Sequence, residues 1–217
     1  MASSVFWLIR HGESTWNTLG LAQGHSDQAE LTVRGQRQAA EVAERFRGLA
    51  VRAIYASDLR RAQQTAVPLA AAVGVPVVLD ARLRERSLGV FEGTSSISIS
   101  PYATGLRSGR VIDADARPER GESVRDLYRR AAAFCDDLAA GRLPGGRGRT
   151  ERTERTERTE RTEQARDVVV VAHGGTLRVL NAYLHGIGVE EMAWEPLENA
   201  RVLRIPAFDT NSQGGTL

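Results

Sequence analysis

The stretch Asp167–Ala172 reads DVVVVA and is followed directly by HGG. An unbroken run of four valines has no polar face, so it is typical of a strand buried on both sides in a parallel sheet. The residues after it have helical spacing from about Thr176 to Leu184. The stretch therefore predicts one strand and one covering helix of an α/β protein.

Apolar segments elsewhere in the chain repeat this alternation of strand and helix. We expect further strands at residues 4–10 (SVFWLIR), 53–57 (AIYAS), 75–79 (VPVVL) and 199–205. Thr32 and Asp58 are placed to cap helices, and Pro68 is expected to kink the second of these. Another amphipathic helix begins near Glu122. This order predicts a three-layer α/β/α sandwich with a central, mostly parallel sheet.

The composition predicts a single domain, residues 1–217, in which arginine carries all the positive charge. The chain is 41% hydrophobic and 26% charged, and its 29 Lys+Arg positions are all arginine. Without lysine, there is no amine for Schiff-base chemistry and no GxxxxGK[ST] phosphate-binding loop. Any bound phosphate must therefore be held by arginine, histidine, backbone amides or a metal ion.

Charge and cysteine content indicate which partners and which cellular compartment to expect. The formal net charge is only +2 at pH 7 and the arginines alternate with acidic residues, so we do not expect a nucleic-acid partner. The apolar run at residues 5–9 is too short for a signal peptide or a membrane span. The single cysteine, Cys135, lies on the apolar face of its helix and allows no internal disulfide. We therefore expect a cytoplasmic protein without a membrane partner, and leave a homodimer open.

Two segments break the alternation. Residues 94–120 have little apolar periodicity, and a long irregular excursion of this kind is often a lid or a binding loop. Residues 150–163 repeat the triplet Thr-Glu-Arg four times and end in Thr-Glu, without any apolar residue. Such a tract cannot join a core, so we expect a low-complexity surface insertion, with a partner-binding arm as the alternative.

Two of the four histidines follow predicted strands. His11 comes after the first strand in RHGES, and His173 comes after the valine strand in AHGG. The carboxyl ends of parallel strands share one edge of a sheet, and ligands of open α/β folds bind there. Arg10 precedes His11, and Arg60 lies in the first turn of a helix, whose N-terminus also favours anions. Together these residues predict an anion pocket that contains a nucleophile.

Other interpretations of these residues are less favoured. Taken singly, a histidine after a strand is more often structural than catalytic, and Arg60 alone would be a solvated helix residue. A zinc site made by His11, His173 and Glu85 would place a dication beside guanidinium groups, and no HxxxH or HxH spacing is present. We therefore expect no metal ion and no cofactor. The GxSxG motif of a serine hydrolase is also absent from the sequence.

Several motifs follow one another along the chain. They are RHGESTWN (10–17), QGHSD (23–27), LTVRGQRQA (31–39), SDLRRAQQTA (57–66), LRERSLGVFEG (83–93), GES (121–123) and VAHGG (171–175). In this order they resemble the histidine phosphatase superfamily, the phosphoglycerate-mutase-like group. The resemblance runs from about residue 5 to residue 184, so it is more specific than any single motif. It implies the fold of that group and a phosphohistidine intermediate.

The resemblance also implies a role for each matching residue. His11 would be the nucleophile that becomes phosphohistidine, and Glu85 would be the proton donor. The phosphoryl oxygens would be held by Arg10, Arg60 and His173. The remaining substrate-binding positions would be Asn17, Gln23, Gly24 and Gly174.

Residues 83–93 favour a phosphatase over a mutase. The segment is close to the ExxxGxxEG pattern of the phosphatase branch, whereas glycolytic mutases resemble one another in an RHYGxLxGLNK segment. We therefore expect metal-independent hydrolysis of a small phosphomonoester. Mutase-type phosphoryl transfer and a weakly active phospholigand-binding module are the alternatives. Tyr102, Arg107 and Arg110 in the excursion are candidates for contacting the leaving group, whose identity the sequence leaves open.

Overall fold

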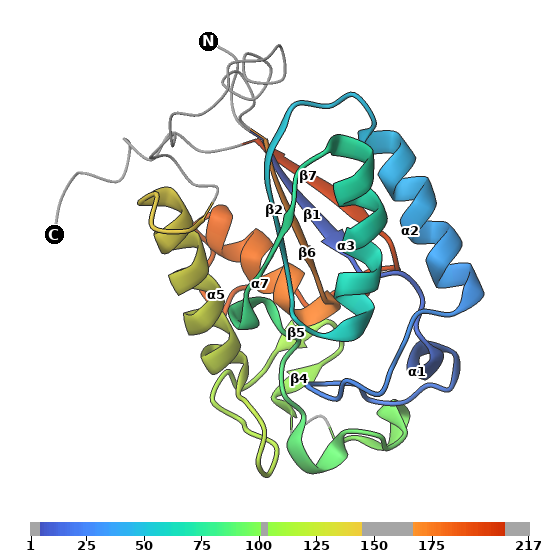
Figure 1. The fold of residues 1–217 in the computed structure, drawn as a ribbon. Coiled ribbons are helices and arrows are strands. Elements are labelled where there is room, and N and C mark those ends of the chain that lie inside the picture. The colour runs from blue at the N-terminus through green and yellow to red at the C-terminus, as the bar shows by residue number, and fades with distance from the viewer. Residues whose placement is uncertain (1–4, 101–103, 145–166, 207–217) are drawn as a thin grey trace, which may run out of the picture.

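A computed structural model of the protein describes residues 5–100, 104–144 and 167–206. Figure 1 shows a central sheet with helices on both sides. Its strand order is β3-β2-β6-β1-β7. The bounds are β1 (Val5–Arg10), β2 (Val51–Ala56), β3 (Val77–Leu79), β6 (Asp167–Ala172) and β7 (Val202–Pro206). All neighbouring pairs are parallel except β1 and β7, which are antiparallel.

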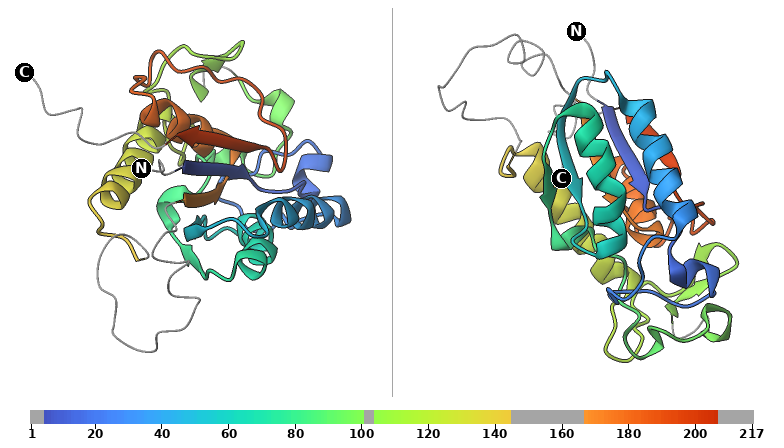
Figure 2. Two further views of the ribbon diagram at one scale, coloured as in Figure 1. Left: turned by 90° about the horizontal axis from the view of Figure 1, so that it is seen from above. Right: turned by 45° about the vertical axis from the view of Figure 1, so that its right-hand side comes forward.

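Helices α2 and α3 cover one face of the sheet, and α5 and α7 cover the other (Figure 2). The helix bounds are α1 (Thr15–Thr18), α2 (Val33–Phe46), α3 (Arg60–Val73), α5 (Val124–Ala139) and α7 (Gly174–Leu184). In β6, Val168 and Val170 belong to the core under α5 and α7, whereas Val169 and Val171 belong to the core under α2 and α3. The predicted three-layer α/β/α sandwich is confirmed.

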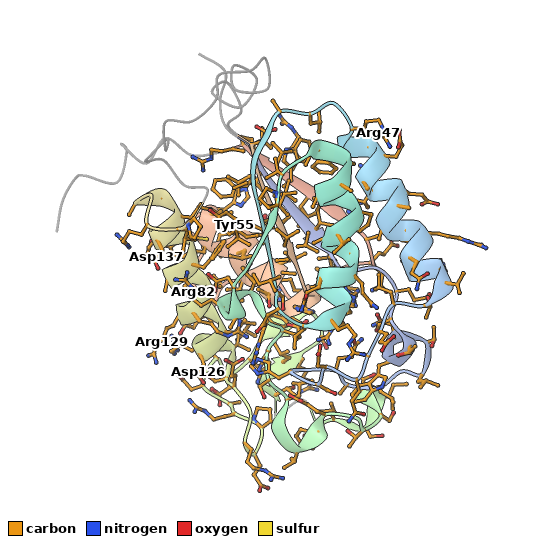
Figure 3. All side chains as sticks on the ribbon, in the orientation of Figure 1. Arg47, Tyr55, Arg82, Asp126, Arg129 and Asp137 are labelled. Atoms are coloured by element: carbon orange, nitrogen blue, oxygen red, sulfur yellow. The ribbon has the colours of Figure 1, made fainter. Side chains whose placement is uncertain are left out.

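The core under α5 is packed around aromatic rings. Tyr55 of β2 meets Phe134 of α5 edge-on, with 5.4 Å between the ring centroids. Figure 3 shows Tyr55 within the molecule and Arg47 at the outer end of α2. Cys135 is buried in this core, as predicted. Burial raises the pKa of its thiol to about 12, so Cys135 is an unreactive core side chain.

The helix starts follow the sequence signals in part. Thr32 caps α2 as predicted, because its hydroxyl accepts the backbone N–H three residues later at 3.0 Å. The prediction that Asp58 caps α3 is wrong: its carboxylate binds the Arg84 guanidinium at 2.7 and 2.6 Å, and Leu59 occupies the N-cap position. Helix α3 is continuous through Pro68.

The structure shortens two of the predicted strands. Strand β3 begins after Pro76, which has no N–H to donate to a sheet. The last strand begins only at Val202, because the residues before it bind the loop that follows β1. Ala200 donates its N–H to the His11 carbonyl oxygen at 3.1 Å, and the Asn199 side chain donates to the same oxygen at 3.2 Å.

The excursion at residues 94–120 is folded around one buried arginine. It contains a short helix, η3 (Ser96–Ser98), and a hairpin of β4 (Leu106–Arg107) and β5 (Arg110–Val111). The Arg86 guanidinium donates to the carbonyl oxygens of Thr104, Ala116 and Glu122 at 2.7, 3.1 and 2.7 Å. The hairpin also meets the segment before β7, where the Trp194 N–H donates to the Gly109 carbonyl at 2.6 Å.

The Thr-Glu-Arg tract at residues 150–163 and Tyr102 lie outside the described residues. Among the helices of the described part, none has the length and apolar character needed to cross a membrane.

Candidate active site

His11 follows β1 and is only 3% exposed. Its Nδ1 lies 2.7 Å from the Gly12 carbonyl oxygen, and a carbonyl oxygen can only accept a hydrogen bond. Nδ1 therefore carries the proton and Nε2 carries the lone pair. Burial holds the pKa of His11 well below its ordinary value of 6.5, and the charges of Arg10 and Arg61 lower it further. The imidazole is thus neutral and nucleophilic at pH 7.

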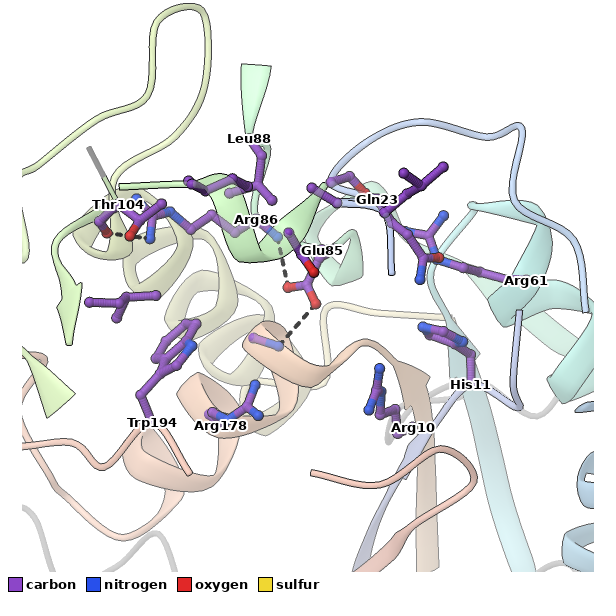
Figure 4. A pocket seen from close by; sticks show the side chains of 17 residues that line it. Arg10, His11, Gln23, Arg61, Glu85, Arg86, Leu88, Thr104, Arg178 and Trp194 are labelled. Atoms are coloured by element: carbon purple, nitrogen blue, oxygen red, sulfur yellow. Dashed lines mark hydrogen bonds between the residues drawn. The ribbon is translucent and has the colours of Figure 1, made fainter. Parts of the chain in front are cut away.

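Arg10 and Arg61 provide positive charge next to His11 (Figure 4). Arg10 is the last residue of β1, and its Nη1 donates to the Leu197 carbonyl oxygen. Arg61 lies in the first turn of α3 and donates to the carbonyl oxygens of Ser26 and Gly24 at 2.8 and 2.9 Å. Burial lowers the pKa of Arg61 to about 10, so it stays charged at pH 7. The Nε atoms of both arginines are buried and have no hydrogen-bond partner among the described residues.

Arg60 does not lie in this pocket, which corrects the sequence prediction. Its side chain is half exposed and pairs with Glu30, while its backbone N–H donates to the Asp27 carboxylate at 2.5 Å. The buried face of α3 consists of Arg61, Ala62, Thr65, Ala66 and Leu69. Arg60 falls one residue outside this face, and its neighbour Arg61 takes the position expected of it.

His173 lies next to His11 in the fold. It follows β6 as predicted, is fully buried, and its ring centroid is 5.2 Å from that of His11. Its Nε2 is 2.8 Å from the Ser57 hydroxyl, whereas its buried Nδ1 has no partner within the described part of the chain. Burial holds the pKa of His173 well below 6.5, and the charge of Arg61 lowers it further.

Glu85 faces the same space from the other side and is anchored at both carboxylate oxygens (Figure 4). Oε2 accepts the Gly175 N–H at 3.0 Å, and Oε1 accepts the Arg86 N–H at 2.9 Å. The Glu85 carbonyl accepts from the Arg130 guanidinium at 2.7 Å, which fixes the backbone beneath the carboxylate. A Cβ atom on Gly175 would lie 2.4 Å from Oε1, so this position needs glycine.

Arg10, His11, Arg61 and Glu85 line a cavity of about 380 Å³. Of the sequence-predicted site residues, those that line it are Arg10, His11, Gln23, Gly24 and Glu85. Asn17, Gly174 and the fully buried His173 do not line it, so the structure does not bring His173 to the cavity wall as the sequence predicted. The Asn17 side chain accepts the backbone N–H of Ser14, the N-cap of α1, and accepts from the Asn199 amide at 3.1 Å. The absence of a side chain at Gly174 leaves room for Arg178. No cluster of three or more His, Cys, Asp or Glu side chains suited to a metal ion occurs in residues 5–100, 104–144 and 167–206.

The family model of the histidine phosphatase superfamily (branch 1) matches residues 6–146 and 148–213 of this chain. The chain belongs to the histidine phosphatase superfamily. The motifs quoted from the sequence lie within the matched ranges, and so do all of the cavity-lining residues.

Relatives of this histidine phosphatase carry two kinds of name. "Probable phosphoglycerate mutase GpmB" of Klebsiella pneumoniae is 43% identical over 142 residues, which are 64% of this chain and 66% of the relative. The match thus spans slightly less than two thirds of that relative. A mycobacterial glucosyl-3-phosphoglycerate phosphatase has a solved structure that is 33% identical, covers 94% of this chain and 90% of its own, and superposes with a TM-score of 0.72. YhfR of Bacillus stearothermophilus is 26% identical, with coverages of 95% and 93% and a TM-score of 0.73.

Sequence reasoning missed several residues of the cavity. Arg61 could have been found from the helical phase of α3, since it lies four and eight residues before the buried Thr65 and Leu69. The sequence carried no such signal for Arg178 or Trp194. Trp194 lies in a loop, and only the folding of that loop brings it to the site. The other missed residues include the large apolar side chains of the wall, which are Leu21, Leu88, Ile99 and Leu106. Arg107 and Arg110 do not line the cavity, whereas Ser96, Ile99, Thr104 and Leu106 of the excursion do.

Proposed function

We propose that this protein is a metal-independent phosphatase that hydrolyses a small phosphomonoester through a phosphohistidine at His11. The observation that carries the proposal is the pair of buried, partnerless Nε–H groups of Arg10 and Arg61 beside a neutral histidine. A buried charged donor without an acceptor is unfavourable, so this site favours a bound anion. The phosphoryl oxygens of a monoester are suitable acceptors.

In the first step, Nε2 of His11 attacks phosphorus. A P–N bond forms and the P–O bond to the alcohol breaks. Protonated Glu85 gives its proton to the leaving oxygen, which avoids release of an alkoxide. The Gly12 carbonyl stabilises the resulting charged imidazole, because its oxygen accepts the hydrogen bond from Nδ1–H before and after the attack.

In the second step, water hydrolyses the phosphohistidine. Glu85, now a carboxylate, takes a proton from the water as its oxygen attacks phosphorus. The P–N bond breaks and returns the electron pair to Nε2, so His11 is neutral again and inorganic phosphate leaves. Glu85 regains the proton that it donated earlier, and the cycle closes.

Arginine supplies the electrostatic stabilisation in this scheme. Charge spreads over three equatorial oxygens during phosphoryl transfer, and fixed donors around them lower the barrier. One such donor contributes about 2.7 to 4 kcal/mol in a dry site. A divalent cation at the same place would be repelled by Arg10 and Arg61, which is why we propose a metal-independent reaction.

Phosphoglycerate-mutase activity is the second candidate. The names of the GpmB relatives favour it, and the mycobacterial phosphatase at 33% identity favours hydrolysis. Incubation with 3-phosphoglycerate and a catalytic amount of 2,3-bisphosphoglycerate separates the two. A phosphatase releases inorganic phosphate, and a mutase accumulates 2-phosphoglycerate.

The test of the proposal is hydrolysis of p-nitrophenyl phosphate in the presence of EDTA. We expect turnover, and an acid-labile, base-stable phosphoenzyme after rapid quenching. His11→Ala should lose both signals. The matched control is His185→Ala, since His185 is an exposed histidine at the end of α7 and should leave both unchanged. Turnover that survives in pure His11→Ala protein would overturn the proposal.

A further inference from the structure

The peptide that links His11 to Gly12 is held at both of its polar edges. Its carbonyl oxygen accepts the Ala200 N–H at 3.1 Å and the Asn199 side-chain amide at 3.2 Å. Its N–H, which belongs to Gly12, donates to the Thr65 hydroxyl at 3.0 Å. Because a peptide is planar, hydrogen bonds at opposite edges fix its rotation. The backbone of His11 is therefore set by two segments that are distant in the sequence.

The next peptide passes this restraint on to the imidazole. The Gly12 carbonyl oxygen accepts Nδ1–H of His11 at 2.7 Å, so the orientation of the ring depends on the Gly12 backbone. Gly12 also packs closely on α2, since a Cβ atom added to it would lie 2.5 Å from the Gly35 carbonyl oxygen. The position of Nε2, the atom that attacks phosphorus in the proposed reaction, thus depends on the contact between Gly12 and Thr65.

The Thr65 hydroxyl makes a second hydrogen bond, within α3. It donates to the Arg61 carbonyl oxygen, one turn earlier in the helix, at 2.8 Å. A buried helical threonine often donates in this way, and that bond alone is an ordinary structural feature. At Thr65 the same oxygen also accepts the N–H of Gly12, which a hydroxyl can do with a free lone pair. One side chain, only 1% exposed, therefore joins the loop after β1 to the start of α3.

Arg61 is a cation whose position has to match that of His11. The two residues line the same cavity, and the Arg61 charge helps to lower the pKa of His11 (Figure 4). The buried Nε–H of Arg61, which has no partner among the described residues, is a donor that the proposed function assigns to the phosphoryl group. A nucleophile and a cation that meet one phosphoryl group from different elements need a fixed separation. Thr65 contacts both elements, at the Gly12 N–H and at the Arg61 carbonyl.

We propose that Thr65 is a positioning residue of the reaction: its hydroxyl holds the His11 loop against the first turn of α3, so that Nε2 and the Arg61 guanidinium meet one phosphoryl group. This inference rests on the proposed phosphatase function. Thr65 does not line the cavity, so it acts through Gly12 and Arg61. Loss of its hydroxyl should therefore slow the attack on phosphorus more than it weakens anion binding.

The test separates the hydroxyl of Thr65 from its methyl group. Thr65→Val keeps the shape of the side chain but leaves the Gly12 N–H without its acceptor, whereas Thr65→Ser keeps the hydroxyl and loses the methyl group. We expect kcat for p-nitrophenyl phosphate to fall roughly 10- to 100-fold in Thr65→Val, as for small misplacements of reacting groups. The inhibition constant of inorganic phosphate should stay within about threefold, because the guanidinium donors remain. Thr65→Ser should keep kcat within about threefold of the wild type.

Two further variants complete the series. Thr18→Val is the matched control, because it removes an exposed threonine hydroxyl that also donates to a backbone carbonyl, that of Thr15, at 2.7 Å. It should leave kcat and inhibition by phosphate as in the wild type. Thr65→Cys has a thiol, which is a weaker hydrogen-bonding group. It should lose part of kcat, and it takes the place of Thr65→Val if that variant does not fold.

A magnetic resonance measurement reports on the imidazole without turnover. In isotope-labelled protein, the resonance of the His11 Nδ1 proton is identified by its loss in His11→Ala. It should be the same in the wild type and in Thr65→Ser, and it should shift or broaden in Thr65→Val, because the Gly12 carbonyl is no longer held in place.

The outcomes distinguish this inference from the proposed function. The positioning role would be overturned by a wild-type kcat in Thr65→Val, by an equal loss in Thr65→Ser, or by phosphate inhibition that weakens as much as kcat falls. Phosphatase activity would still stand in each of these cases. A wild type that hydrolyses no monoester would overturn the proposed function, and the Nδ1–H resonance would then decide whether Thr65 orients His11.

Discussion

The imidazole rings of His11 and His173 lie 5.2 Å apart, centroid to centroid, with their planes inclined at 58°. Both are buried, and burial holds both pKa values well below 6.5. Two protonated rings at this distance would also repel each other. The pair is therefore neutral in the folded protein over the range in which an exposed histidine takes up a proton.

This pair predicts a loss of stability in mild acid. The unfolded chain binds protons at both histidines near pH 6.5, and the folded protein does not bind them until the pH reaches the lower folded pKa values. The unfolded state binds more protons in that window. The contribution of the two histidines to the free energy of unfolding is therefore fully present above pH 6.5 and is lost as the pH falls below it. Urea titrations over this range measure the slope. His173→Gln should flatten it, and His185→Gln should leave it as in the wild type; identical slopes in all three proteins would contradict this account.

Adjacent arginines at the start of α3 should behave differently when each is replaced by lysine. Arg61→Lys keeps the charge but loses the planar fork that contacts two carbonyl oxygens and carries the unpartnered Nε–H, so we expect kcat/KM to fall by roughly 100- to 1,000-fold. Arg60→Lys alters a half-exposed ion pair and should change it by less than about twofold. Steady-state kinetics with p-nitrophenyl phosphate checks both. The placement of Arg60 outside the site fails if the two variants lose activity equally.

Gly175→Ala should damage proton donation more than phosphoryl binding. The new Cβ would lie 2.4 Å from Glu85 Oε1 and push the carboxyl group out of place. We expect kcat for an alkyl phosphate to fall by about 100-fold, as for other small misplacements of catalytic groups. p-Nitrophenyl phosphate should be affected much less, because nitrophenolate leaves without a proton. Gly188→Ala is the control, since no atom lies within 4 Å of its added Cβ. Equal losses with both substrates would argue against Glu85 as the acid.

Arg86→Met should loosen the excursion at residues 94–120. The variant removes three hydrogen bonds from a side chain that is 2% exposed and leaves their carbonyl oxygens without that donor. We expect the free energy of unfolding to fall by about 3 kcal/mol and proteolysis within the excursion to become faster. Arg107→Met changes an exposed arginine of the β4–β5 hairpin, which lies in this excursion, and serves as the control. A wild-type unfolding curve for Arg86→Met would show that the excursion is held by other contacts.

The parts of the fold that follow from local patterns could be predicted from the sequence. The valines of β6 predicted a strand covered on both faces, which the structure shows. His11 and His173 lie side by side at the ends of β1 and β6, as expected for neighbouring parallel strands. The motif that contains Arg60 and Arg61 located the cationic helix start, but the prediction placed Arg60 in the pocket, where the structure places Arg61. The buried positions of α3 would have decided between them, because residues 61, 65 and 69 share one face.

The part of the cavity lined by Arg86 and Trp194 could not be predicted, because its shape depends on contacts between segments that are distant in the sequence. Trp194 is placed by a hydrogen bond to Gly109, and Arg86 reaches three carbonyl oxygens of the excursion and its flank. Asp58 likewise looked like a helix cap and instead binds Arg84. Local propensity carries no information about such partners.

The antiparallel addition of β7 to β1 has a consequence for the order of events during synthesis. Of the five strands of this sheet, β1 leaves the ribosome first, yet its two neighbours are β6 and β7, which emerge after the other three. Arg10 and His11 also depend on the late segment, since the Leu197 carbonyl holds the Arg10 side chain and the His11 carbonyl accepts from Ala200. A nascent chain that stops before residue 197 thus carries the nucleophile without these contacts. Catalytic competence should arise in one late step, when residues 197–206 pack against β1 and His11.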